Sequence, residues 1–311
     1  MIGVKEMNML KRIAGYTLII TLITVLAACG NSGSGSNADD FRTLTDAAGH
    51  EVKVPNHPKR IIAPFLEDPL SALGVKPVAQ WGAGGVPQHY LQDQLKEVPV
   101  LDMNGGLKAE EALSYKPDLI VFLAPTYIPD GNYDQFAKIA PTFVLSNDET
   151  DWKGNLEKLG KLLNEDDAAK KAVEDYDKSL ADAKDQLGSL PSEKTAVVLQ
   201  ADEEKGFALF GPSFYGGATL YGALGFKQPA IVKNDYDKFS IEALAQLQDV
   251  DYIFVISGEG RGKPPVNNPL WKGLSAVKAG HVYEADSGHW FNANPIANKL
   301  IIADVLKDVH E

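Results

Sequence analysis

Short apolar runs alternate along the chain with longer segments of mixed polarity. The runs with strand character cover residues 60–65, 77–81, 119–123, 142–145, 195–199, 207–210, 252–256 and 281–283. Within each run the apolar positions are continuous rather than alternating, which is typical of strands covered on both faces in a parallel sheet. The pattern therefore predicts two α/β halves, with helical segments such as Ser240 to Gln248 between the strands.

The segment between the two halves has a clear helical period. From Asp166 to Leu187, apolar residues recur every three or four positions, and Gly188 to Pro191 predict the end of the helix. At 1.5 Å per residue, such a helix is about 30 Å long. The period alone fits a surface helix within one domain equally well, but the central position favours a strut that connects two lobes and permits only a modest hinge motion.

The start of the chain has the pattern of an export signal. Basic residues precede an apolar run from Tyr16 to Ala27 that is too short for a comfortable transmembrane helix. The stretch Leu26 to Gly30 resembles a bacterial lipobox, and Cys29 is the only cysteine in the chain. A chance cysteine after an ordinary signal peptide is the alternative. We expect residues 1–28 to be a lipoprotein signal peptide and Cys29 to carry acyl chains such as palmitate.

The remaining chain divides by composition into a tether and a globular body. Residues 29–40 are small and polar and predict a flexible tether. We expect an N-terminal lobe at 41–150, helices that include the connecting helix at 151–190, and a C-terminal lobe at 191–311. The formal net charge of -12 argues against nucleic-acid binding, because no basic patch is available for phosphates. We expect a monomer that is tethered outside the cytoplasm.

Sequence motifs for catalysis or cofactor binding are not found. The segment from Trp81 to Pro87 lacks the third glycine of a dinucleotide loop, and Gly258 to Lys263 lacks the spacing of a phosphate loop. No Gly-x-Ser-x-Gly nucleophile elbow occurs, and no histidine pair has helical metal-ligand spacing. His50 and His57 fall in a predicted hairpin before the first strand. We therefore expect no enzyme, no cofactor and no resident metal.

Aromatic residues follow the ends of several predicted strands. In open parallel sheets, ligands bind outside the carboxyl ends of the strands, so these residues can converge on a cleft between two lobes. Aromatic rings also offer flat surfaces to a planar or apolar ligand. The predicted ligand-binding residues are Trp81, His89, Tyr90, Tyr127, Phe210, Tyr215, Arg261, Trp290 and Phe291.

An ordered set of segments resembles a known family. The segments are 58–62, 70–77 and 110–120 in the first half, and 240–244, 271–283 and 290–297 in the second. Together they resemble the lipoprotein substrate-binding components of iron-siderophore ABC transporters, over residues 41–310. The resemblance implies two Rossmann-like α/β lobes with central, mainly parallel sheets, joined by a single long helix. It also implies a membrane-tethered receptor that delivers a ferric siderophore to an ABC permease for iron transport.

The resemblance further implies two residues that dock the permease. Members of the family present one glutamate from each lobe to arginines of the permease, and the matching positions here are Glu110 and Glu242. Glu111 is adjacent and is an alternative counterpart for Glu110. Two carboxylates on separate rigid lobes would steer docking and fix its register.

The small number of arginines narrows the range of possible ligands. Arg42, Arg60 and Arg261 are the only arginines after the lipobox, whereas binders of catecholates and carboxylates commonly line the cleft with several basic residues. Residues 207–229 resemble the ferric-hydroxamate subgroup, although Asn104 stands where some of its members carry arginine. A weakly charged complex suits an aromatic cleft with one arginine. We favour a ferric hydroxamate, with ferric citrate second; haem, cobalamin and a bare metal ion held by His89, His281 and His289 remain alternatives.

Overall fold

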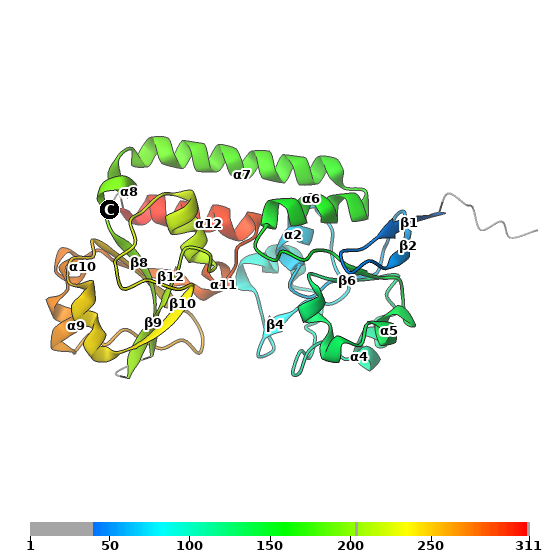
Figure 1. The fold of residues 1–311 in the computed structure, drawn as a ribbon, viewed down its shortest axis with the longest axis horizontal. Helices are drawn as coiled ribbons and strands as arrows, with labels where there is room; N and C mark the ends of the chain where they lie inside the picture. The colour runs from blue at the N-terminus through cyan, green and yellow to red at the C-terminus, as the bar shows by residue number, and fades with distance from the viewer. Residues whose placement is uncertain (1–39, 203–204, 310–311) are drawn as a thin grey trace, which may run out of the picture. The chain divides into compact units, whose positions relative to one another are not determined.

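The computed structural model describes residues 40–202 and 205–309. The predicted signal peptide, Cys29 and the predicted tether up to residue 39 lie outside the described residues. Residues from Phe41 onward belong to one compact unit. Each of its two lobes contains one main sheet, and the described residues also form two two-stranded hairpins (Figure 1). Among the described residues, no helix is both long enough and apolar enough to cross a membrane.

The sheet of the N-terminal lobe is parallel. Its strands run in the order β3-β6-β7, with bounds β3 (Ile61–Ile62), β6 (Leu119–Phe122) and β7 (Thr142–Val144). The predicted strand at 77–81 is reduced to isolated bridges from Ala79 to Ile62 and from Gln80 to Val100. Pro77 offers no backbone donor to a ladder, and the chain then turns into a small hairpin of β4 (Gly82–Ala83) and β5 (Val86–Pro87).

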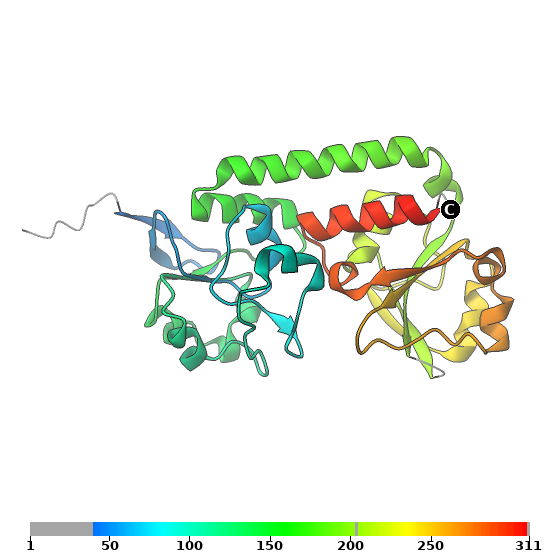
Figure 2. The same cartoon turned by 180° about the vertical axis from the view of Figure 1, so that it is seen from behind.

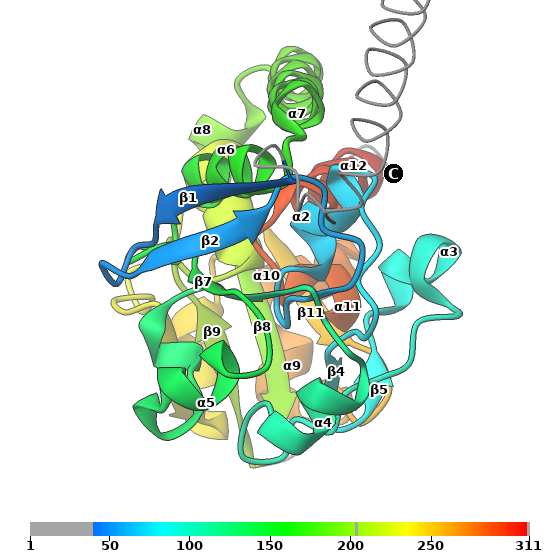
Figure 3. The same ribbon diagram turned by 90° about the vertical axis from the view of Figure 1, so that its right-hand side faces the viewer.

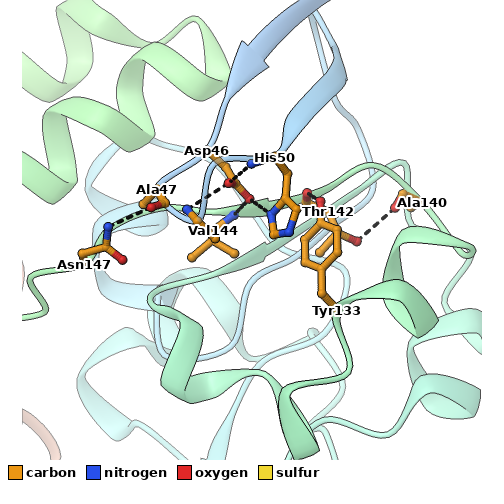
Figure 4. Close-up of polar contacts among 9 residues, drawn as sticks. Asp46, Ala47, His50, Tyr133, Ala140, Thr142, Val144 and Asn147 are labelled. Carbon is orange, nitrogen blue, oxygen red and sulfur yellow. Dashed lines mark hydrogen bonds and ion pairs between the residues drawn. The ribbon is translucent and has the colours of Figure 1, made fainter.

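An antiparallel hairpin of β1 (Phe41–Thr45) and β2 (Glu51–Pro55) precedes this sheet. Its turn is fixed by Asp46, whose carboxylate accepts hydrogen bonds from His50 Nδ1 at 2.9 Å and from the Val144 amide at 3.1 Å (Figure 4). The His50 ring stacks on Tyr133 with centroids 3.8 Å apart. The hairpin predicted before the first strand is therefore confirmed for His50, which has a structural role in attaching it to β7, whereas His57 lies beyond the end of β2.

The sheet of the C-terminal lobe has five strands in the order β10-β9-β8-β11-β12. The bounds are β8 (Ala196–Asp202), β9 (Gly206–Phe210), β10 (Tyr236–Ser240), β11 (Tyr252–Ser257) and β12 (Val282–Asp286). Strands β8, β11 and β12 are parallel, whereas β9 pairs antiparallel with both β8 and β10. The sheet is thus parallel at one side and antiparallel at the other.

Both sheets are covered on both faces, as the continuous apolar runs predict. In β6, Leu119 and Val121 face one apolar cluster while Ile120 and Phe122 face another. In β8, successive residues from Ala196 to Leu199 alternate in the same way between two clusters. Strand β6 and the first four residues of β8 therefore bury every side chain, and helices supply the second layer on each face.

The predicted connecting helix is α7 (Asp166–Leu187), with the predicted bounds. It ends at Gly188, which has a φ of 54° that glycine adopts without strain. Ala169 belongs to an N-terminal apolar cluster, whereas Tyr176, Ala183 and Leu187 belong to a C-terminal one. Figures 1 and 2 show α7 in green along both lobes. The predicted fold class, two α/β lobes joined by one long helix, is confirmed.

The other helical segments fill the connections. In the N-terminal lobe and its junction to α7 they are α2 (Glu67–Ala72), η2 (His89–Leu91), α3 (Gln92–Leu95), α4 (Ala109–Ser114), η3 (Pro125–Tyr127), η4 (Pro129–Gly131), α5 (Tyr133–Ala137) and α6 (Trp152–Leu163), whereas α8 (Leu190–Glu193) follows α7 beside the C-terminal lobe. In the C-terminal lobe they are η5 (Ala218–Ala223), η6 (Ile241–Leu247), α9 (Pro269–Gly273), α10 (Ser275–Ala279), α11 (Ser287–Trp290) and α12 (Pro295–Val309). The predicted helix at 240–248 is a 3₁₀ helix, η6, that follows β10 directly.

Candidate ligand-binding cleft

Two adjoining cavities lie between residues of the two lobes. The larger has a volume of about 700 Å³ and the smaller about 440 Å³. Trp81 and Gln88 of the N-terminal lobe line both cavities, as do Tyr215 and Phe291 of the C-terminal lobe. Because they share these walls, we treat the two cavities as one site, called the cleft below.

The walls of the cleft are largely aromatic. On the N-terminal side, the Phe65 ring lies between Trp81 and Tyr127, with centroids 4.9 Å from each. On the C-terminal side, the rings of Tyr215 and Phe291 are 5.8 Å apart. Such rings can contact a large uncharged ligand surface from both sides.

One aromatic residue of each wall has an unusual backbone conformation. Phe65 has a φ of 69° and Tyr215 a φ of 44°, in the left-handed region that bulky residues rarely occupy. This conformation costs roughly 1 kcal/mol or more at each residue and persists only where surrounding packing enforces it. Strain of this kind clusters at functional sites, and here both strained residues line the larger cavity.

Six of the nine predicted ligand-binding residues line the cleft. They are Trp81, His89, Tyr127, Tyr215, Arg261 and Phe291. The Arg261 guanidinium carbon lies 4.4 Å from the centroid of the Phe291 ring, so its charge rests on an aromatic face at the smaller cavity.

The other three predicted residues do not line either cavity. Trp290 is fully buried: its ring stacks on Phe254 at 5.1 Å, and its Nε1 donates to Asp304 at 2.9 Å. Phe210 is also fully buried and lies 5.0 Å from Phe291, which it supports from behind. The prediction of cleft contacts was wrong for both, because packing inside the C-terminal lobe takes up their rings.

Tyr90 is the third misplaced residue. Its hydroxyl donates to Asp68 Oδ2 at 2.9 Å and accepts from Asn292 Nδ2 at 2.8 Å. Because Asn292 belongs to the other lobe, Tyr90 connects the lobes and is absent from the cavity walls. Tyr90 therefore does not line the cleft, and its contact with a ligand stays a prediction.

Sequence reasoning missed many residues of the cleft, among them Phe65, Gln88 and Glu149. Phe65 was placed inside the predicted strand at 60–65, but the observed strand β3 ends at Ile62. Glu149 follows β7, so the rule that placed aromatic residues at strand ends could have found it. Gln88 precedes His89, and no sequence pattern marked it as a cleft residue.

Asp68 forms a polar joint between the lobes next to the cleft. Its carboxylate accepts from the backbone amides of Ile296 at 3.0 Å and Ala297 at 2.9 Å, in addition to Tyr90. These amides lie in the first turn of α12, so an acid of the N-terminal lobe caps a helix of the C-terminal lobe. The joint fixes the two lobes beneath α7.

Substitution of Asp68 by alanine is expected to lower the free energy of unfolding by about 2 kcal/mol. Two amides and the Tyr90 hydroxyl lose an acceptor in a buried place, and relief of the buried carboxylate offsets only part of that cost. Urea unfolding and hydrogen exchange at Ile296 and Ala297 measure both effects. Asp93→Ala, at an exposed acid in α3, is the matched control. Unchanged exchange at the two amides in Asp68→Ala would contradict the capping role.

Glu67 adjoins Asp68 and is more unusual still. It is 1% exposed; its Oε1 accepts from the Trp81 amide at 2.6 Å, while Oε2 is buried with no hydrogen-bond partner. Burial raises the pKa of Glu67 to about 7 and that of Asp68 to about 6. The amide that Glu67 holds belongs to Trp81, so this acid positions a wall of the cleft.

The two predicted docking glutamates lie away from the cleft. Glu110 is exposed in the first turn of α4, and Glu242 is exposed at the start of η6. The Ser240 side chain bonds to Glu242 and lowers its pKa. Glu111, the alternative to Glu110, uses its Oε1 to accept from the Asp102 amide at 2.9 Å. Glu110 is thus the better placed of the two for a partner.

The helix α4 lies away from α7. Figures 1 and 3 show α4 and α9 on the side of the lobes opposite α7. A partner that meets this side would meet both lobes at once.

The histidines proposed as metal ligands do not come together. His89 is exposed at the cleft, His281 stacks on Tyr252 at 5.0 Å, and His289 is buried with its Nε2 2.6 Å from Asp304. Within residues 40–202 and 205–309, no group of three His, Cys, Asp or Glu side chains is arranged to hold a metal ion.

The comparisons with known proteins agree with this architecture. The family model for periplasmic binding proteins matches residues 68–288. The iron(3+)-hydroxamate-binding protein FhuD of Bacillus subtilis is 29% identical over 92% of this chain and 94% of its own length. The Fe(3+)-citrate-binding protein YfmC of the same organism is 31% identical over 96% and 98%.

A solved structure shows the same fold. A periplasmic binding protein of the FhuD fold family, from a Fep/Fec-like ferrichrome ABC transporter of Bacillus subtilis, superposes with a TM-score of 0.69 at 25% identity. The match covers 86% of this chain and 100% of that one. With a family model that spans most of both lobes and relatives of nearly full length, the chain belongs to the periplasmic binding protein family.

Proposed function

We propose that the protein is an extracytoplasmic receptor that binds a ferric siderophore in the cleft and delivers it to an ABC permease. The observation that carries the proposal is the cleft itself, whose aromatic walls come from both lobes. A ligand held there contacts Trp81 on one side and Phe291 on the other, so its binding is coupled to the spacing of the lobes.

The favoured ligand is a ferric hydroxamate. Within residues 40–202 and 205–309, Arg261 is the only lysine or arginine that lines either cavity, and its charge already rests on Phe291. A highly charged chelate would need several cations to replace its hydration. The relative named for hydroxamate binding supports this choice. The relative named for ferric citrate favours ferric citrate as the second candidate.

Anchoring and docking complete the proposal. The lipobox supports attachment of Cys29 to the membrane. Glu110 and Glu242 are proposed to meet basic residues of the permease, since each is exposed and each belongs to a different lobe. A tether that keeps the receptor beside the permease raises its local concentration, so individually weak docking contacts suffice.

A tryptophan-fluorescence titration tests the ligand. Ferric hydroxamates are expected to quench the protein tightly, and Trp81→Ala is expected to weaken binding roughly tenfold because one wall of the cleft is lost. Ferric citrate, a ferric catecholate, haem and cobalamin complete the panel. Trp271→Phe is the control, because Trp271 packs in an apolar cluster on the far face of the C-terminal sheet. Tight binding of the catecholate with none of the hydroxamates would overturn the proposal.

A further inference from the structure

We propose that the cleft selects ferric hydroxamates that carry a pendant ammonium group, and that the Glu149 carboxylate receives this group. The inference rests on the proposed function and names the substrate class within it. It begins from the charges that line the cleft.

The cleft walls are acidic in balance. Glu149 lines the larger cavity, and Glu259 and Asp286 line the smaller one, against the single cation Arg261. Counting Asp, Glu, Lys and Arg only, the described residues that line the two cavities carry a formal net charge of minus two. An anionic chelate would meet this field with like charge, which works against its binding. A neutral or cationic complex meets no such penalty.

Glu149 is held in place by neutral donors. One carboxylate oxygen accepts from the Thr126 hydroxyl at 2.8 Å and the other from the Tyr127 hydroxyl at 2.9 Å. Both donors lie in η3, directly after β6 and Leu123. These bonds orient the carboxylate but leave its charge unneutralised, and each oxygen retains a further lone pair. Among the residues that the structure describes, no lysine or arginine lines the larger cavity to compensate this charge.

The position of Glu149 suits a pendant group rather than the iron-bearing core. Trp81, Tyr215 and Phe291 are common to both cavities, so the uncharged core fits between these rings. Glu149 lies only on the larger cavity, although its charge reaches across the cleft. After burial, that charge is the second cause that raises the pKa of Tyr215 on the opposite wall. A chain extending from the core into the larger cavity would bring its end toward Glu149.

Ligand entry would strengthen this contact. Glu149 is exposed in the open cleft, where water screens its charge. A bound core displaces that water, and the attraction between carboxylate and ammonium grows as the local dielectric constant falls. We therefore expect ligands of different charge to differ in their affinity for the cleft.

A charge series on one scaffold tests the inference. Ferrioxamine B, a linear ferric trihydroxamate, carries one ammonium group; its N-acetyl derivative is neutral and its N-succinyl derivative is anionic. Affinity is expected to fall in that order, by roughly tenfold from the first to the second. Glu149→Gln is expected to bind the first two about equally, with the affinity for the neutral derivative unchanged. Glu157→Gln is the matched control, because it removes an exposed acid of α6 that lines neither cavity and should preserve the ratio.

The outcomes distinguish the charge selection by the cleft from the proposed function of the protein. Equal binding of all three derivatives by the unaltered protein would overturn the charge selection while the proposed function stands. A ratio that survives Glu149→Gln would overturn the role of Glu149. If none of the three binds while another ferric chelate does, the hydroxamate proposal fails, and this inference fails with it. A ratio that shrinks as salt is added supports an electrostatic origin.

Discussion

Uptake of the ligand is expected to fall at least about a hundredfold when Glu110 and Glu242 are both replaced by arginine, with ligand affinity unchanged. The change turns two exposed carboxylates into cations that repel basic residues of the proposed permease partner. Loss of two charged contacts and the new repulsion together amount to several kcal/mol at the docking surface. Neither residue lines the cleft, so binding itself has no reason to change.

Two measurements separate docking from binding in this variant. Uptake of a radioactive iron complex by cells reports transport, and fluorescence titration of the purified protein reports affinity. Glu157→Arg with Glu193→Arg is a suitable control, since it reverses two other acids in α6 and α8. Normal uptake by the Glu110 and Glu242 double variant would remove these residues from the docking proposal.

Stability is expected to fall by about 3 kcal/mol between pH 4.5 and pH 8 because of Glu67. Its pKa is about 7 in the folded protein against an ordinary value of 4.5, and each pKa unit corresponds to about 1.4 kcal/mol. Between these two values, the folded state binds more protons than the unfolded state. The stabilisation is therefore complete below pH 4.5 and is lost as the pH rises through 7.

Glu67→Gln is expected to remove this part of the pH dependence and to stabilise the protein at pH 8. The remaining slope at lower pH belongs to Asp68, whose pKa is raised from 3.8 to about 6 by burial. Urea unfolding at several values between pH 5 and pH 8 measures the effect. Glu110→Gln, at an exposed glutamate, should leave the profile unaltered. Parallel profiles for the unaltered protein and Glu67→Gln would show that Glu67 does not titrate in this range.

The elements that depend on local pattern were predicted well from the sequence. The stripe from Ala169 to Leu187 and the stop at Gly188 predicted α7 with its bounds. One strand was assigned to the wrong kind of pairing: Phe207 to Phe210 is antiparallel to β8. Only three residues separate β8 from β9, which is too few for the crossover that parallel strands require. The short spacing between these two strands in the sequence therefore predicts an antiparallel pair.

The cleft was harder because aromatic residues serve packing and binding alike. Trp81 and Trp290 both follow predicted strands, yet one lines the cleft and the other is buried. The difference arises from a distant segment: a Cβ on Gly216 would come within 2.5 Å of the Trp290 ring, so the backbone there packs directly on it. Likewise, the sequence places Asp68 among the ordinary acids at the start of a helix. Only the fold brings it to the Ala297 amide, 229 positions away, which donates a hydrogen bond to its carboxylate.

The way α7 packs has a consequence for how the protein resists degradation. Ala169 is buried with the N-terminal core, and Ala183 with the C-terminal core. Neither lobe can open without exposing its half of the same helix, so local opening of one core weakens the other. A protease that cleaves an opened segment of one core would then also lower the stability of the other. Through α7, the resistance of one lobe to proteolysis depends on the stability of the other.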